Sequence, residues 1–461
     1  MELLVIHWSS VGLKVAQLLL SLSILILLHE FGHYITARWF KCRVDKFYLF
    51  FDPWFSIVKK KIGDTVYGIG WLPLGGYCKI AGMVDESMDK EQIKLPPQPH
   101  EFRSKPAWQR LIILLGGVTV NVLLAFLIYA MILFVWGETK TVNSSLHNGV
   151  WVTDSLMNEI GLRTGDKILA VNDKKEKYFE DIPKHILIGG GTNIRINRGG
   201  KDSTIVIPEA IIGKLVEKKR SKTQLLLPRL PAIVGDFRKK DTTNAWKAGL
   251  RYQDKIIKVD STTVQFLDEM SVYNSTHKGS TVLFTIERDG LQKQIPVLVD
   301  SDGLAGIPFL RDTVYKNLSV YDLEIRKFGF FESFPAGVSR TFTSLSDYID
   351  QFKLIFKPSS QAYKGLGGFK SMGSIFGGDT WDWELFWRIT AFFSIVLAFM
   401  NLLPIPGLDG GHVLFTLGEM ITGRKPSDKF LEYAQIVGMV LLLALMLYAN
   451  GNDWFGWGRG K

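Results

Sequence analysis

The sequence predicts a multi-span α-helical membrane protein with four transmembrane helices, a membrane-associated β-hairpin or sheet, and two extracytoplasmic α+β domains. Two observations predict this fold class. Four stretches are apolar over about the 20 residues that a bilayer core requires, and the long polar segment between the second and third stretches contains an internal repeat. Of the 461 residues, 47% are hydrophobic and 22% are charged, which fits a chain that is part membrane-embedded and part water-soluble.

The predicted spans divide the chain into segments. The spans cover residues 13–41, 111–136, 384–406 and 432–449. The segments are 1–43 (first span), 44–110 (cytoplasmic and membrane-reentrant β region), 111–137 (second span), 138–224 and 225–311 (the two α+β domains), 312–383 (amphipathic linker), 384–422 (third span) and 423–461 (cytoplasmic loop, fourth span and tail).

The distribution of positive charge predicts the orientation of the spans. Loops with many Lys and Arg residues near span ends stay on the cytoplasmic side. Such residues close the loop before the second span and recur between the third and fourth spans (Arg103, Lys105, Arg110, Arg424, Lys425 and Lys429). Both termini and residues 137–383 are therefore expected on the extracytoplasmic face.

The net charge of +10 does not indicate nucleic-acid binding. Phosphate binding needs clustered Lys and Arg, but the densest basic stretch, residues 38–61, directly follows the first apolar helix. Topology rules place positive charge there. The lipid bilayer is the expected partner of this stretch, and no nucleic acid is expected.

A repeat lies in the extracytoplasmic segment. Residues 161–172 align without gaps to residues 249–260, and each copy is a G-L-x-x-x-D-K-I turn that leads into an alternating strand. Tandem duplication is the simplest cause, and short β-rich runs surround both copies.

The first span contains a candidate metal site. His29 and His33 are four residues apart and so lie on one helix face, where both can bind one zinc ion while Glu30 acts as general base. The alternative is a chance H-E-x-x-H motif whose histidines only form hydrogen bonds in a core. Ionisable residues in a spanning helix are costly and favour the functional interpretation.

A catalytic zinc ion needs a third protein ligand and one open position for water. The best remote candidate is Asp409 in the segment N-L-L-P-I-P-G-L-D-G-G-H at 401–412. Its two prolines are expected to break the third span, and non-helical backbone at membrane depth must be shielded by protein or line a cavity. His412 is the competing ligand, although we favour a packing or orienting role for it.

The pairing of H-E-F-G-H at 29–33 with this segment, on either side of the repeat, resembles the site-2 protease family, and within it the bacterial regulator of sigma-E protease (RseP) type. The resemblance implies a zinc metalloprotease with His29, His33 and Asp409 as Zn²⁺ ligands, Glu30 as catalytic base and Asn401 as a substrate-holding residue. It also implies intramembrane cleavage of single-span proteins, such as anti-sigma factors or signal-peptide remnants, in the bacterial inner membrane, with the active site in the cytoplasmic half.

Each repeat resembles the PDZ domain, whose "GL-x-x-GD-x-I-x-x-VN" signature the first copy matches fully and the second, with Gln253 and Asp260 substituted, in part. PDZ domains add a peptide tail as a strand at a sheet edge. The alternative is a rigid filter that keeps bulky proteins away from the membrane. The sequence does not separate the two.

Two further segments resemble the family. Residues 66–82 are similar to its membrane-reentrant β-hairpin, where an edge strand could pair with substrate backbone; a plain cytoplasmic hairpin is the alternative. The candidate substrate-binding residues there are Gly68, Gly70, Pro73, Gly75 and Gly76. In the second span Val118 stands where the family has proline, but Asn121 still matches and is a candidate to orient substrate or metal, or to form an interhelical hydrogen bond.

Two other functions remain as alternatives. A membrane-anchored PDZ scaffold with a non-catalytic metal site would have no need of Glu30. A membrane zinc protease of the prenyl-processing type predicts a glutamate ligand on a later helix and no repeat, and Asp409 and the duplicated motif disfavour it.

Overall fold

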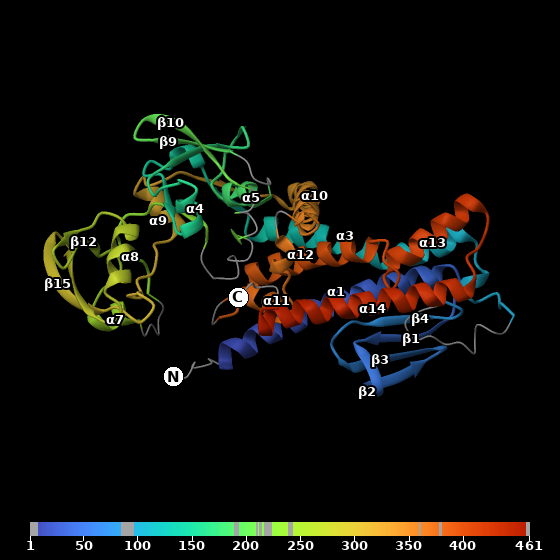
Figure 1. Cartoon of the computed structure of the whole chain (residues 1–461). Coiled ribbons are helices and arrows are strands. Elements are labelled where there is room, and N and C mark those ends of the chain that lie inside the picture. The colour runs from blue at the N-terminus through green and yellow to red at the C-terminus, as the bar shows by residue number, and fades with distance from the viewer. Residues whose placement is uncertain are drawn as a thin grey trace. The chain divides into compact units, whose positions relative to one another are not determined.

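The computed structural model describes residues 8–83, 96–188, 193–208, 211, 214–215, 224–237, 243–358, 361–377 and 380–457. The chain forms two compact units (Figure 1). The helical unit comprises Met1–Gly137, Lys327–Lys353 and Tyr363–Lys461, and the repeat unit comprises Glu138–Arg326 and Leu354–Ala362. The chain ends, residues 1–7 and 458–461, lie outside the described part, so their side of the membrane stays a prediction.

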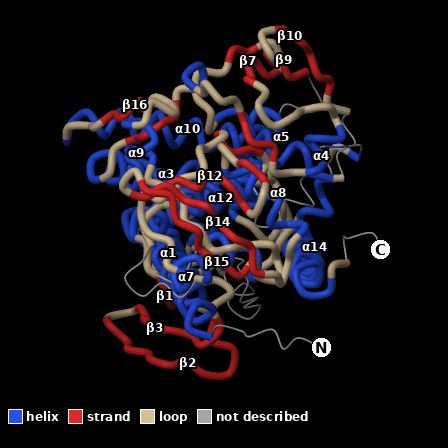
Figure 2. The backbone as a smooth tube through the Cα atoms, turned by 90° about the vertical axis from the view of Figure 1, so that its left-hand side faces the viewer, coloured by secondary structure: helices blue, strands red, loops and turns tan. Residues whose placement is uncertain are grey.

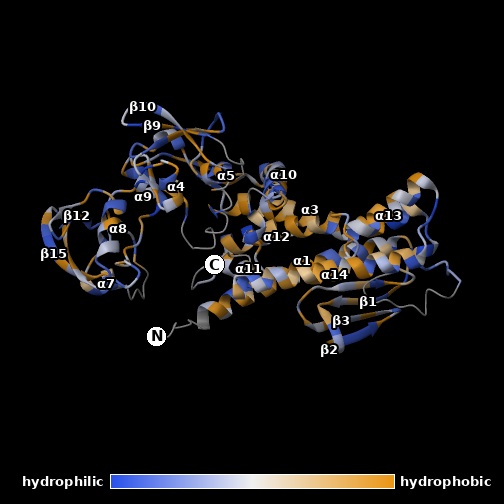
Figure 3. Cartoon of the chain, in the orientation of Figure 1, coloured by the Kyte–Doolittle hydropathy of each residue, from blue (hydrophilic) through white to orange (hydrophobic). Residues whose placement is uncertain are grey.

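Four helices of the described residues are long and apolar enough to cross a membrane, and Figure 3 shows the apolar residues along them. They are α1 (Trp8–Trp39), α3 (Ala107–Val135), α12 (Trp383–Leu402) and α14 (Asp428–Phe455). Each overlaps one of the predicted spans. The chain is therefore a membrane protein that also carries several β-sheets.

The helices α1 and α3 cross with very little space between their backbones. A Cβ atom added at Gly32 would lie 2.3 Å from the carbonyl oxygen of Gly116, and one added at Gly116 would lie 2.5 Å from that of Gly32. Membrane helices associate through small residues that permit such close approach. On its other side α3 packs against α12, where Ala125 and Ala391 are fully buried in one apolar cluster.

The predicted break in the third span is confirmed. The helix α12 ends at Leu402 and α13 (Asp409–Thr422) begins six residues beyond Leu403. Pro404 and Pro406 lie between them and cannot donate the backbone hydrogen bonds that would continue a helix. Gly407 has φ of 100°, a left-handed conformation that glycine adopts without strain.

A four-stranded sheet follows α1, in the order β2-β3-β1-β4 (Figure 1). Its strands β1, β2 and β3 are labelled from another side in Figure 2. The strands are β1 (Val44–Leu49), β2 (Phe51–Ile62), β3 (Thr65–Leu72) and β4 (Tyr77–Ile80). The expectation of a hairpin over residues 66–82 is wrong, because β3 and β4 both pair with β1, parallel and antiparallel respectively, and not with each other. The earlier strand β1 separates them, so β3 is interior and β4 is an edge.

The repeat unit contains two sheets of the same strand order, which agrees with the duplication seen in the sequence. One sheet runs β10-β9-β7-β8 and the other β15-β14-β12-β13. An equivalent ion pair occurs in both, with buried Asp166 bound by Arg198 at 2.7 Å and buried Asp254 bound by Arg288 at 2.6 Å. The strands are β7 (Lys167–Val171), β8 (Lys174–Lys175), β9 (Asn193–Arg198), β10 (Lys201–Val206), β12 (Lys255–Val259), β13 (Thr262–Thr263), β14 (Thr281–Arg288) and β15 (Leu291–Leu298).

The chain enters and leaves the repeat unit on paired strands, β5 (Glu138–Thr141) and β16 (Leu323–Arg326). The unit also contains β6 (Val150–Val152), β11 (Leu226–Pro228), α4 (Ser155–Glu159), α5 (Asp181–Ile188), α7 (Asn244–Ala248), α8 (Leu267–Thr276), α9 (Asp312–Asn317) and the 3₁₀-helix η2 (Asn143–Ser145). Buried side chains of both repeats form one continuous hydrophobic cluster. The boundaries at 224 and 311 stay predictions.

The linker predicted to hold an amphipathic helix contains α10 (Phe330–Ile355). Its small and hydroxyl residues face inward, because Ser333 and Thr341 are buried and a Cβ atom at Gly337 would lie 2.6 Å from the backbone nitrogen of Ala130. Several phenylalanines, including Phe331, are exposed. The remaining elements of the described residues are η1 (Phe102–Ser104), η4 (Ala362–Gly365) and α11 (Phe369–Ile375).

Candidate metal centre

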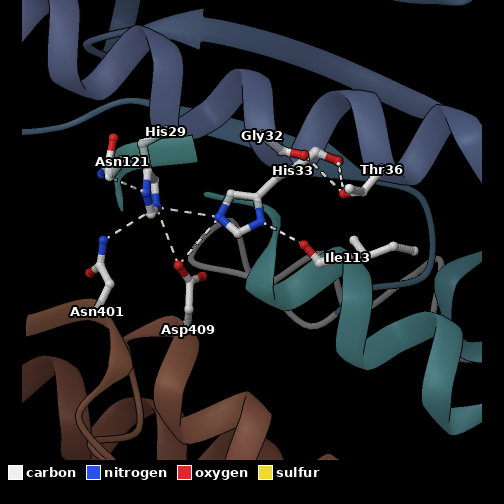
Figure 4. Close-up of polar contacts among 8 residues, drawn as sticks. All are labelled: His29, Gly32, His33, Thr36, Ile113, Asn121, Asn401 and Asp409. Carbon is white, nitrogen blue, oxygen red and sulfur yellow. Dashed lines mark hydrogen bonds and ion pairs between the residues drawn. The ribbon is translucent and has the colours of Figure 1, made fainter. Parts of the chain in front are cut away.

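Three side chains from two distant segments meet in the helical unit (Figure 4). His29 and His33 project from adjacent turns of α1, and Asp409 is the first residue of α13. The Nε2 atoms of the two histidines are 3.3 Å apart, and Asp409 Oδ2 lies 3.2 Å from His29 Nε2 and 3.3 Å from His33 Nε2. Both histidines are only 7% exposed.

This triangle has the dimensions of a zinc site. Three ligand atoms held tetrahedrally at about 2.0–2.1 Å from one zinc ion lie about 3.3–3.4 Å from one another. Asp409 Oδ2 is buried and receives no hydrogen bond of normal geometry from the described residues. Two facing imidazole nitrogens and a carboxylate oxygen offer lone pairs that a bound cation satisfies, so the residues present fit Zn²⁺.

A hydrogen bond orients His33 for this role. Its Nδ1 atom lies 2.9 Å from the carbonyl oxygen of Ile113 on α3. A carbonyl oxygen only accepts, so Nδ1 carries the proton and Nε2 keeps its lone pair for the metal. Ligating histidines commonly have such a partner on the second ring nitrogen.

Tight packing of the segment before α13 holds Asp409 in place. A Cβ atom added at Gly410 would lie 2.2 Å from the carbonyl oxygen of Leu403, and one at Gly438 of α14 would lie 1.4 Å from that of Pro406. The proline-containing segment between α12 and α13 is thus enclosed by its own turn and by α14. This packing is why a carboxylate remote in sequence reaches the histidines of α1.

Glu30 lies beside the three ligand atoms. It lines the same cavity, and its carboxylate accepts a hydrogen bond from the backbone amide of Cys78 on β4. Asn401, on the last turn of α12, has its amide nitrogen 3.2 Å from His29 Nε2. A candidate base and a candidate hydrogen-bond donor therefore line the same cavity as the three ligand atoms.

A cavity of about 700 Å³ opens onto the centre. Gly75, Gly76 and Asn401 line it, as do His29, Glu30, His33, Asp409 and His412. His412 lies outside the cluster of three ligand atoms found among the described residues.

Four of the predicted substrate-binding residues do not line this cavity: Gly68, Gly70, Pro73 and Asn121. A Cβ atom at Gly68 would lie 2.3 Å from the Tyr48 ring, and one at Gly70 would lie 2.1 Å from the carbonyl oxygen of Phe51. The absence of a side chain at these two positions therefore permits close packing within the sheet. Asn121 is fully buried and does not line the cavity, and a substrate contact by this residue stays a prediction.

The sequence interpretation missed several polar residues of the cavity. Gln435 is 5% exposed and lines the cavity from α14, a helix in which few residues are buried. A lone amide inside an apolar span is costly and is by default a functional signal, and that signal could have identified it. Lys46 and Asp52 of the β-sheet also line the cavity and had no distinguishing sequence pattern.

The sequence of the chain is similar to those of known proteases. The sequence matches the model of Peptidase family M50 over residues 17–445, a range that includes the three candidate ligands and Glu30. It is 25% identical to the "Regulator of sigma E protease" of Haemophilus influenzae, over 95% of this chain and 98% of that protein. It is also 27% identical to the "Putative zinc metalloprotease" of Treponema pallidum, over 94% of this chain and 96% of that protein.

Proposed function

Because the chain belongs to Peptidase family M50, the site-2 protease family, and is a zinc metalloprotease, we propose that it hydrolyses a peptide bond within or near the transmembrane segment of single-span membrane proteins. One observation carries the proposal. Glu30 and the three ligand residues face a single cavity inside a unit built from membrane-spanning helices. A scaffold with a non-catalytic metal site would need neither the cavity nor the base.

The residues divide the chemistry between them. His29, His33 and Asp409 would hold Zn²⁺, which when bound would supply a Lewis acid that lowers the pKa of water and polarises the scissile carbonyl. Glu30 accepts the proton of the attacking water and delivers it to the leaving amine. Asn401 donates its amide N–H groups to the substrate beside His29.

Removal of the metal is expected to abolish cleavage. Incubation with 1,10-phenanthroline followed by buffer exchange should reduce hydrolysis of a single-span peptide in detergent to background, and one equivalent of Zn²⁺ should restore it. The non-chelating isomer 1,7-phenanthroline serves as the matched control. Full activity in protein shown to be metal-free by elemental analysis would exclude a zinc mechanism.

The edge strand β4 is the proposed binding surface for the substrate backbone. It pairs only with β1 among the described strands, and its Cys78 amide bonds Glu30, so a strand added to this edge runs beside the catalytic base. A helical substrate must become extended before it can pair in this way.

Strand addition predicts a two-residue periodicity of backbone recognition. Only every second N–H of an added strand faces its partner, and each lost hydrogen bond costs about 0.5–1.5 kcal/mol. Peptides N-methylated at three alternate positions around the cleavage site should therefore bind about tenfold or more weakly in one register and almost normally in the other. An equal loss of binding affinity in both registers, measured from inhibition constants, would argue against strand pairing.

The name of a related protein supports one class of proposed substrate. The name of the Haemophilus influenzae protein refers to sigma E regulation, which supports anti-sigma factors as substrates. Signal-peptide remnants are a second class of single-span substrate. The bacterial inner membrane is the proposed location, with the repeat unit and both termini outside and the metal centre in the cytoplasmic half.

The two repeats are proposed to be PDZ-like domains that meet the outer part of a substrate. They either capture a peptide tail at a sheet edge or exclude bulky outer domains. Competition by a free tail peptide would favour capture. A strong effect of outer-domain size without such competition would favour exclusion.

A further inference from the structure

Asn121 lies at a junction of three helices. It is on α3 and is fully buried. Its side-chain amide nitrogen is 3.1 Å from Nδ1 of His29 on α1, and its backbone oxygen accepts a 2.7 Å hydrogen bond from the Ser394 hydroxyl of α12. The amide oxygen, Oδ1, is buried and has no hydrogen-bond partner among the described residues.

The chemistry of His29 decides how this amide is oriented. His29 Nε2 faces Asp409 and His33, and it can bind a metal only if its lone pair is free. The proton of the neutral ring is then on Nδ1, which must donate to an acceptor. The oxygen and nitrogen of an asparagine amide have nearly the same shape and are assigned from their hydrogen bonds.

Rotation of the Asn121 amide by half a turn resolves both difficulties. Oδ1 then takes the position 3.1 Å from His29 Nδ1 and accepts its proton. The buried oxygen gains the donor that it lacks in the other orientation, and His29 keeps Nε2 for the metal. The two ligand histidines then have equivalent arrangements, because the carbonyl oxygen of Ile113 already accepts from His33 Nδ1.

We propose that Asn121 is a positioning residue that fixes the tautomer and ring orientation of His29, and that it does not contact substrate. The inference rests on the proposed function of the metal centre and adds α3 as the helix that orients both histidines. At Ile113 the backbone carbonyl oxygen accepts the proton of His33, so the identity of the side chain matters little there. At position 121 the side chain accepts the proton of His29, so a residue with a hydrogen-bond acceptor is required there.

The test uses the full chain in detergent with Asn121→Leu and Asn121→Asp. Loss of a hydrogen-bond partner to a ligand histidine lowers metal affinity by about 10–100-fold, so the leucine variant should show this loss in chelator competition. Its Co²⁺-substituted form should have an altered visible spectrum. The aspartate variant, which accepts from Nδ1, should bind zinc at least as tightly as wild type.

Ser394→Ala is the matched control, because it removes the hydrogen bond to the Asn121 backbone and leaves the side-chain amide in place. It should lower thermal stability without changing zinc affinity or the Co²⁺ spectrum. Where the leucine variant binds zinc and cleaves, kcat should fall and KM should stay unchanged. If the leucine variant does not fold, the aspartate variant remains decisive, since a tenfold loss of zinc affinity there would overturn the proposal.

Wild-type zinc affinity in Asn121→Leu, or an effect on KM alone, would also overturn the inference. Metal binding and the Co²⁺ spectrum are measured without substrate. A wild-type protein that binds zinc but cleaves no single-span peptide would therefore refute the proposed function while leaving the role of Asn121 intact.

Discussion

Replacement of Glu30 by glutamine is expected to lower cleavage by about 10²–10⁴-fold, the usual contribution of a positioned general base, while zinc binding is retained. Glutamine has nearly the same shape but cannot accept the proton of the attacking water. Glu30 is not among the three residues whose ligand atoms converge, so the metal site should survive. Cleavage of a purified single-span peptide and zinc content by elemental analysis check both parts.

A matched substitution separates the chemistry from a general effect of charge. Glu384→Gln makes the same change on α12, where the carboxylate pairs with Arg388 outside the cavity, and should leave cleavage unchanged. Asp409→Ala should lose zinc and activity together. Wild-type turnover by Glu30→Gln would remove the base from the mechanism and leave only the metal centre.

Local sequence geometry predicted the part of the site that lies on one helix. His29 and His33 are one turn apart on α1, so their common face follows from helical periodicity alone. Asp409 was predicted from the prolines before it, which indicated a break in a span, and from the family resemblance. Its approach to the histidines depends on packing around Gly410 and Gly438, which no local pattern reveals.

Non-local strand pairing explains the error in the β region. The apolar runs over β3 and β4 are adjacent in sequence, and adjacent strands usually form a hairpin. Here β1 pairs with both, and a strand earlier in the chain cannot be placed between two later ones by periodicity. The role of Asn121 was left open for a similar reason, because its partner His29 is on another helix.

Gly117 of α3 gives the second large effect, because the absence of a side chain there makes room for the metal ligands. A Cβ atom at this position would lie 2.4 Å from His33 Nε2 and 2.6 Å from His29 Cε1. Gly117→Ala should therefore displace one or both imidazoles. Overpacking costs about 1–3 kcal/mol, which corresponds to about 5- to 150-fold in zinc affinity, and cleavage should fall at least in proportion.

Gly418→Ala is the control for this change, because it adds the same methyl group to α13, the helix that begins with Asp409, where nothing lies within 4 Å. Alanine is the better helix former, so that variant should be as active as wild type and equally or more stable. If Gly117→Ala instead bound zinc normally, the imidazoles would have to tolerate a shift of α3 against α1. The backbones at Gly32 and Gly116 leave no space for such a shift towards α1, and a shift away from α1 would lengthen the hydrogen bonds that orient both histidines. The geometry of the metal centre therefore depends on the close crossing of these two helices.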